Sequence, residues 1–211
     1  GGADLVADPQ TVTIVDDQQA NVAVVGVDNP FSAGSVAVAK TVDGSAADSA
    51  YVAGLEYTIA VECAVDVNGT LVTVLDRDVS VAGDGVPVTV VDDVGDPALL
   101  PLGARCWGSE PDTQGATSFT IDADSYANGV EVVADTAAGI QALQIDVTNT
   151  FEAASLTVTK QVVNQPGPGA WTFDVACTRV GADGSTQAAP LLTGTSPVTL
   201  ADGASATFTV L

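Results

Sequence analysis

The sequence contains no histidine and no methionine, and only five of its 211 residues are Lys or Arg. Histidine is the commonest general base and the commonest metal ligand, so its absence argues against ordinary acid–base and metal catalysis. Three cysteines are too few for a four-thiolate zinc site, and no glycine-rich phosphate loop is present. We therefore predict no catalytic residues for turnover, no resident cofactor, and a protein that is not an enzyme.

Positive charge is nearly absent, because 27 Asp and Glu residues give a formal net charge of −22. Such a chain repels phosphate backbones and anionic lipids, so we expect no nucleic-acid partner. No apolar run reaches the 18 residues that suggest a membrane span, and we expect no membrane insertion in this segment. Since 46% of the residues are hydrophobic and only 15% are charged, the chain should fold.

Apolar and polar residues alternate with a period of two along several short stretches. The clearest are residues 55–63, 145–151 and 156–162, each with the pattern of a half-buried β-strand. Turn signals such as Asn68-Gly69 and Asp202-Gly203 separate these stretches. Many short strands joined by Gly/Asp turns predict an all-β fold, an antiparallel β-sandwich of the Ig-like kind.

An internal repeat sets the predicted domain organisation. Residues 27–31 and 36–40 recur as 147–151 and 156–160, both displaced by 120 positions, so one repeat takes about 120 residues. Residues 1–31 should then be the C-terminal strands of a preceding repeat, 32–151 one complete repeat, and 152–211 the N-terminal half of a following repeat. The sequence thus predicts tandem β-sandwich domains.

Two lysines and two asparagines fall on the apolar faces of the predicted strands. Lys40 shares its face with valines on the first strand of the complete repeat, and Lys160 takes the equivalent place in the following repeat. Asn149 and Asn29 lie in the same way on the closing strands. A buried ammonium and a buried amide are both costly without partners, so their recurrence on core faces requires a reason.

One reason is that the two side chains react with each other. A desolvated, neutral lysine amine is a nucleophile, and an asparagine amide becomes an electrophile when its carbonyl is polarised. Glu110, four residues after Cys106 and on the same strand face, is the candidate acid that would shuttle the protons. Three plainer interpretations stay open: lysines that extend along the sheet to solvent, asparagines that hold a turn, and an exposed glutamate.

These residues lie in motifs that resemble a known family. Lys40 within Val-Ala-Lys-Thr-Val, Glu110 after Leu-Pro-x-Gly, and Asn149 within Val-Thr-Asn-Thr-Phe resemble the B-type repeats of Gram-positive collagen-binding adhesins and pilins. The resemblance implies a self-catalysed isopeptide bond between Lys40 and Asn149, assisted by Glu110. Lys160 and Asn29 would be the equivalent residues of the flanking repeats. The cysteines depart from ordinary B-type repeats and are similar to a disulfide-containing variant in secreted proteins of high-GC Gram-positive bacteria.

A disulfide between Cys63 and Cys106 is predicted independently of that chemistry. Both cysteines fall on apolar strand faces, and no neighbouring histidine suggests thiol reactivity. Closing a loop of this length contributes roughly 4 kcal/mol in the chain-entropy model. Cys177, the equivalent of Cys63 in the following half-repeat, is expected to be unpaired by truncation. Two buried free thiols are the alternative.

Clustered aspartates offer a weak case for calcium between repeats, although Asp is also the ordinary residue of turns. The clusters are Asp76 with Asp78, Asp92 and Asp93 with Asp96, and Asp122 with Asp124.

Taken together, the sequence predicts an extracellular structural protein. We expect a stalk or fibre segment of a bacterial cell-surface adhesin, built from tandem repeats that are each stapled between distant strands. Its partners would be neighbouring repeats of the same chain or fibre. The alternatives are a ligand-binding adhesin module, with recognition loops at residues 66–70 or 112–115, and a halophile surface-layer or filament subunit. Head-to-tail self-assembly by domain swapping is a further hypothesis.

Overall fold

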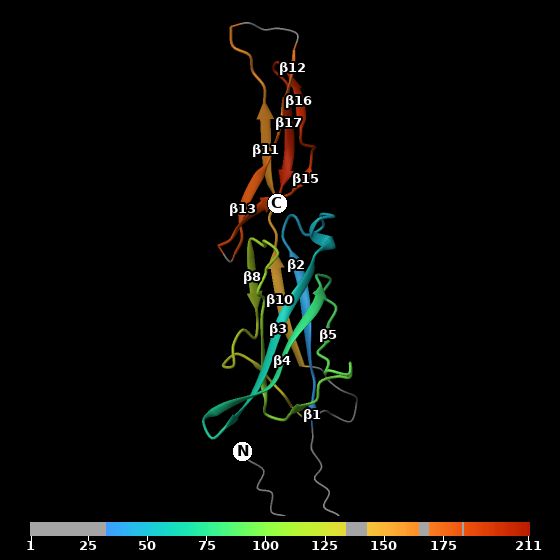
Figure 1. Ribbon diagram of the computed structural model, residues 1–211, viewed down its shortest axis with the longest axis vertical. Helices are drawn as coiled ribbons and strands as arrows, with labels where there is room; N and C mark the ends of the chain where they lie inside the picture. Colours follow the sequence, from blue (N-terminus) through green and yellow to red (C-terminus); the bar gives the residue numbers. More distant parts are fainter. Residues whose placement is uncertain (1–32, 134–142, 165–168, 183) are drawn as a thin grey trace, which may run out of the picture. The chain divides into compact units, whose positions relative to one another are not determined.

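The computed structural model describes residues 33–133, 143–164, 169–182 and 184–211 (Figure 1). Regular structure in these ranges consists of β-strands and one 3₁₀ turn, η1 (Val52–Gly54), which confirms the predicted all-β class. No helix in these ranges is long and apolar enough to cross a membrane. The predicted closing strands at 1–31, with Asn29, lie outside the described residues.

Within residues 33–133 and 143–151 there are ten strands: β1 (Ala33–Gly34), β2 (Val36–Asp43), β3 (Glu56–Val67), β4 (Thr70–Ala82), β5 (Val88–Thr89), β6 (Leu100–Pro101), β7 (Arg105–Ser109), β8 (Ser118–Ile121), β9 (Val130–Glu131) and β10 (Leu143–Thr150). Seven more lie in the described residues after 152: β11 (Ala154–Thr159), β12 (Ala170–Phe173), β13 (Cys177–Val180), β14 (Thr186–Ala189), β15 (Leu191–Thr193), β16 (Val198–Ala201) and β17 (Ser205–Val210).

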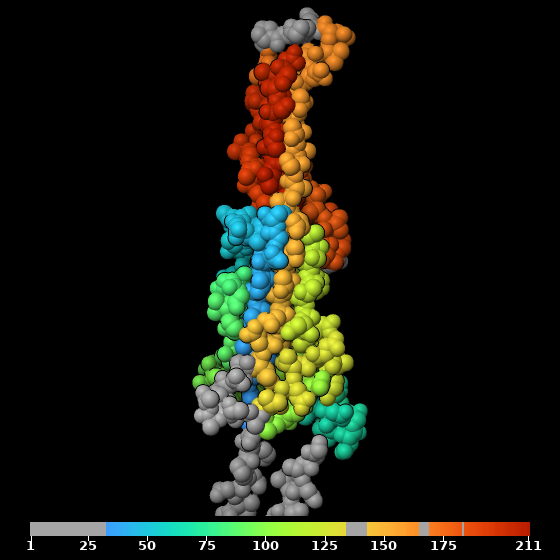
Figure 2. Space-filling view, turned by 180° about the vertical axis from the view of Figure 1, so that it is seen from behind, coloured from blue at the N-terminus to red at the C-terminus, as the bar shows by residue number. Residues whose placement is uncertain are grey.

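The first four-stranded sheet has the order β5-β2-β10-β8. It places β2, the first long strand, beside β10, the last strand before residue 152. β2 and β10 run parallel over their whole length, from the pair Val36–Leu143 to the pair Asp43–Thr150. Figure 2 shows the two strands side by side at the surface. The prediction of a purely antiparallel sandwich is wrong for this pair. Parallel neighbours need a long crossover connection, and here the second sheet lies in that connection.

The second four-stranded sheet has the order β4-β3-β7-β9, and its described pairs are antiparallel. β3 and β4 form a long hairpin whose turn is the predicted Asn68-Gly69. Both turn residues have positive φ, 54° and 83°, as a tight hairpin turn of the primed type requires. On the other side of β3 lies β7, which carries Cys106 directly opposite Cys63.

The two sheets bury their inner faces in one hydrophobic cluster, which is the arrangement of a β-sandwich. Along β10, Ile145, Val147 and Asn149 are buried while the intervening Gln144 and Asp146 are exposed. This is the alternation the sequence predicts for a half-buried strand. The cluster includes Val36, Val38, Ile145 and Val147 from the first sheet and Tyr57, Ile59, Val61 and Cys63 from the second.

Residues 154–211 repeat several contacts of the preceding part. Val158 of β11 lies opposite Ala206 of β17, as Val38 of β2 lies opposite Val88 of β5. Beyond these pairs, the Gly203 N–H donates to the Lys160 carbonyl at 2.8 Å, and the Gly85 N–H donates to the Lys40 carbonyl at 2.7 Å. Both contacts have the same displacement along the sequence, 120 residues on the first strand and 118 on its partner.

Candidate functional site: a buried lysine, glutamate and asparagine

The centre of the sandwich holds an ammonium group. Lys40 lies on the inward face of β2, between the neighbouring strands β5 and β10, and is 0% exposed. The residue cannot bring its head group to solvent, so the interpretation of Lys40 as a lysine that extends to the surface is wrong.

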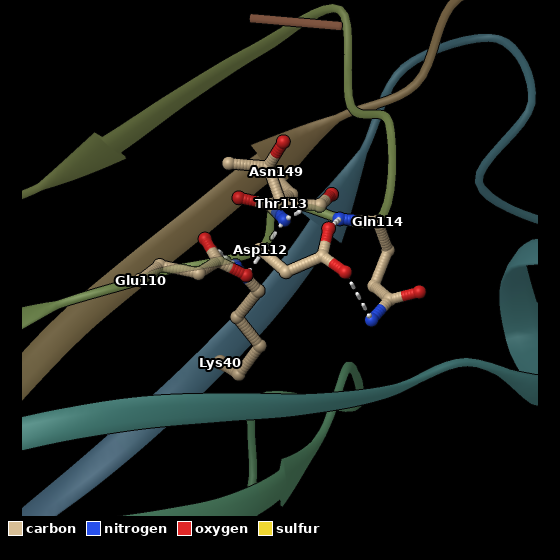
Figure 3. Close-up of polar contacts among 6 residues, drawn as sticks. All are labelled: Lys40, Glu110, Asp112, Thr113, Gln114 and Asn149. Atoms are coloured by element: carbon tan, nitrogen blue, oxygen red, sulfur yellow. Dashed lines mark hydrogen bonds and ion pairs between the residues drawn. The ribbon is translucent and has the colours of Figure 1, made fainter. Parts of the chain in front are cut away.

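Glu110 provides the counter-charge for Lys40 (Figure 3). It follows the last residue of β7 and precedes Pro111, and its side chain points into the core at 8% residue exposure. The Nζ of Lys40 donates to both carboxylate oxygens of Glu110, each at 2.9 Å. Glu110 is therefore not the exposed glutamate of the plainer interpretation.

Asn149 of β10 completes the site from the neighbouring strand. Its Nδ2 donates to Oε1 of Glu110 at 2.9 Å and to the carbonyl oxygen of Thr113 at 3.1 Å, while its Oδ1 is buried without a partner among the described residues. In the register of the parallel pair, Lys40 lies opposite Val147, two residues before Asn149 on the same face. One oxygen of Glu110 thus accepts hydrogen bonds from both the lysine and the asparagine nitrogen.

Burial controls the electrostatics of this site. Removal of the Lys40 ammonium from water lowers the pKa of Lys40 below 10.5, while the hydrogen bond to Glu110 and its negative charge oppose that shift. The ring of Tyr57, whose centre lies 4.7 Å from the lysine Nζ, gives a cation–π contact. The hydroxyl of Tyr57 is buried without a described partner. Burial, followed by the charge of Glu110, raises the pKa of Tyr57 to about 12.

Sequence reasoning missed Thr113, which acts through its backbone carbonyl. The turn after Glu110 brings this carbonyl to Asn149: Asp112 Oδ1 accepts from the Gln114 N–H at 2.8 Å, and the Thr113 carbonyl also accepts from the Ala116 N–H at 3.0 Å. Asp112 and Gly115 signal a turn in the sequence, but nothing in the sequence signals which carbonyl faces the core.

The equivalent lysine of the following half-repeat has different surroundings. Lys160 is half-buried, and its Nζ lies 4.6 Å from the centre of the Trp171 ring, as Lys40 lies over Tyr57. Its Nζ donates to the Gln161 carbonyl at 3.2 Å. Within the described ranges, Lys160 makes no ion pair within 4 Å. Asn29 lies outside those ranges.

The predicted disulfide between Cys63 and Cys106 is confirmed, with Cα atoms 4.0 Å apart. It joins neighbouring antiparallel strands of one sheet, so it does not staple distant strands as expected. Opposite positions on adjacent strands are close enough for a bridge, which the spacing of cysteines in the sequence cannot reveal. Cys177 on β13 is a free thiol and half-buried.

Asp92 and Asp124 hold turns in the described structure, whereas Asp76 and Asp78 lie on strand β4. Asp92 Oδ1 accepts from the N–H groups of Val94 and Asp96 at 2.9 and 3.0 Å, and Asp124 Oδ1 accepts from the Asn128 amide at 2.9 Å. Asp93 pairs with Arg77. Among the residues described, no group of three or more acidic or Cys side chains is arranged to hold a metal ion.

The fold and the site define a class of protein: an all-β module whose first and last long strands meet at a buried Lys–Glu–Asn cluster. The family described as Domain of unknown function (DUF5979) matches residues 36–152, from the first residue of β2 to two residues beyond β10. The match covers more than half of the chain, which belongs to this family. No curated protein and no solved structure matches the chain.

Proposed function

We propose that residues 32–151 are one repeat of an extracellular stalk, closed by an amide bond between Lys40 Nζ and Asn149 Cγ. The observation that carries the proposal is the double contact of Glu110, whose Oε1 lies 2.9 Å from both the attacking and the leaving nitrogen. Neither Lys40 nor Asn149 is exposed at all, so the reaction would proceed away from water.

The chemistry balances with these three side chains alone. Glu110 takes a proton from the Lys40 ammonium, which replaces a buried ion pair by a neutral amine and a neutral acid. The amine attacks Cγ of Asn149, and the C–Nδ2 bond breaks as Glu110 returns the proton to the leaving nitrogen. Glu110 then takes the second proton from the attacking nitrogen, so the products are a secondary amide and one ammonia. Glu110 ends neutral if ammonia leaves as NH3, and ionised if it passes this proton on and ammonium leaves.

The strand order favours a mechanical role for this bond. β2 and β10 are parallel neighbours, so a pull on the start of β2 and the end of β10 loads their hydrogen bonds in shear. An amide between Lys40 and Asn149 would carry the force directly from one strand to the other. The chain between them, including the whole second sheet, would stay unloaded.

The repeated contacts at Lys40 and Lys160 support a tandem arrangement. In both places a glycine N–H donates to the lysine carbonyl and an aromatic ring lies under the ammonium. The disulfide of Cys63 and Cys106 supports an extracellular location, because such bonds persist in oxidising compartments.

Intact mass spectrometry of the purified chain tests the proposal. The wild type should weigh about 17 Da less than its sequence after correction for the disulfide, because one ammonia is lost. Lys40→Met should have its full mass. Lys160→Met is the matched control and should keep the loss. A wild type at full mass would overturn the proposed bond.

A ligand-binding module is the second candidate, favoured by the apolar end of the β3–β4 hairpin. Val67, Leu71 and Val72 are about half exposed there. This candidate requires that Leu71→Lys and Val72→Lys abolish adhesion of the chain to host surfaces while the mass and fold remain unchanged.

A further inference from the structure

The turn that holds Asn149 is itself held by a segment far along the chain. Arg179, on the β13–β14 hairpin, donates from Nη2 to the Gln114 carbonyl at 2.9 Å. The Ala182 N–H of the same hairpin donates to the Ala116 carbonyl at 3.0 Å. Two hydrogen bonds thus join the hairpin to residues 114–116.

Gly115 lets the guanidinium of Arg179 lie against the turn. A Cβ atom at this position would clash with the guanidinium of Arg179, which would have to move away from the turn. Gly115 also has φ of +75°, and the preceding Gln114 has φ of +53°, a conformation that non-glycine residues adopt at a cost. The external contacts therefore stabilise a turn that is locally unfavourable.

The same turn sets the geometry of the reacting groups. It begins two residues after Glu110, and Thr113, adjacent to Gln114, supplies the carbonyl that holds the Asn149 amide. A shift of the Gln114 carbonyl therefore moves the neighbouring acceptor, and misplacement of reacting groups by about 1 Å costs on the order of 100-fold in rate.

Arg179 is committed to this contact. Two of its other donor nitrogens, Nε and Nη1, are buried without a partner in the described part of the chain, although acidic residues are abundant. By contrast, Arg77 pairs with Asp93 and Arg105 with Glu131. Buried donors without acceptors are costly and disfavour this position of Arg179. We therefore infer that the packing of the hairpin on the turn holds Arg179 in place.

We propose that Arg179 is a positioning residue for the reaction of Lys40 with Asn149, so that docking of the β13–β14 hairpin accelerates closure of the preceding bond. This inference rests on the proposed function. During synthesis, the bond at Lys40 would then form fastest after the chain through residue 189 has folded. In a stalk of such repeats, each cross-link would report that the next repeat has begun to fold.

Refolding kinetics test the inference. The full chain is recovered from inclusion bodies directly into urea, so that it has not folded and the amide has not formed, and it is then diluted into buffer and quenched at intervals for mass spectrometry. Arg179→Gln should lose ammonia at least about tenfold more slowly than the wild type, because a charged donor to the Gln114 carbonyl is lost. Arg179→Lys, which keeps a charged donor, should recover part of the rate. Arg77→Gln is the matched control for lost charge and should react at the wild-type rate.

Circular dichroism on the same samples separates positioning from folding. We expect Arg179→Gln to gain β-structure as fast as the wild type while its loss of about 17 Da lags behind. Equal rates of ammonia loss in Arg179→Gln and wild type would overturn the role of Arg179 alone. A wild type that folds without any loss of mass would overturn the proposed bond and this inference with it.

Discussion

The buried ion pair can be tested separately from the cross-link by removing its charges one at a time and together. Lys40→Met leaves Glu110 without its cation, and Glu110→Gln leaves the ammonium without its carboxylate. All of these variants lack an essential group, so none forms the amide and their stabilities are directly comparable.

The structure indicates the size of the effect. Both charged side chains have zero side-chain exposure in the ion pair, so solvent provides no screening for the remaining charge. Removing one partner of such a pair typically costs about 3–5 kcal/mol, whereas replacing both by uncharged groups is often neutral or stabilising. The double variant Lys40→Met/Glu110→Gln should therefore be more stable than each single variant by about 3–5 kcal/mol at pH 7.

Urea unfolding followed by circular dichroism, without reductant so that the disulfide stays closed, measures these free energies. The order of stability is the decisive result, since Lys40→Met and Glu110→Gln act on opposite charges. A double variant no more stable than either single variant would refute the buried pair, because it would mean that the remaining charge reaches water.

Three further outcomes are expected. Tyr57→Phe should keep the loss of about 17 Da. Its urea midpoint should be unchanged or higher, because the change removes a buried hydroxyl without a described partner and keeps the ring under the ammonium. A large loss of stability would contradict this. In Asn149→Ala, which cannot cross-link, the free energy of unfolding should rise as pH approaches 10, because the unfolded Lys40, with its pKa of 10.5, binds more protons than the folded one. Above pH 10 the free energy of unfolding should fall, because folded Tyr57 keeps its proton until about pH 12. A free energy that only falls from pH 8 upward would contradict the lowered pKa of folded Lys40. In single-molecule pulling, Lys40→Met should unfold, and its extension should be greater by about 150 Å after reduction, the length of the 43-residue separation closed by the disulfide. In the wild type this repeat should neither unfold under load nor lengthen after reduction.

Much of the site could be predicted from the period of the strands. Alternation alone puts Lys40 among inward valines and Asn149 between two apolar residues, and both are fully buried. The separation of four from Cys106 puts Glu110 on the inner face, although it lies just past the end of β7. These predictions hold because side-chain direction along a strand follows directly from residue number.

What the sequence could not predict are the contacts between segments. The parallel pairing of β2 with β10 depends on strand order, and the alternation of apolar and polar residues does not show which strands are neighbours. The disulfide was predicted, but not its place between adjacent strands, for the same reason. Thr113 and Gln114 act through backbone carbonyls, so their side chains give no signal. Lys160 has the sequence pattern of Lys40 without its burial, because the described part of its sheet has no strand equivalent to β10 beside β11.

Tryptic peptide mapping of the reduced and alkylated chain tests the central claim most directly. Trypsin cleaves after Lys and Arg, and Lys40 resists cleavage once its amine is acylated. The account predicts one branched species that joins residues 1–77 to residues 106–160, lighter than the two peptides together by about 17 Da, with fragment ions that assign the junction to Lys40 and Asn149. Separate peptides 1–40, 41–77 and 106–160, each at its full mass, would contradict it.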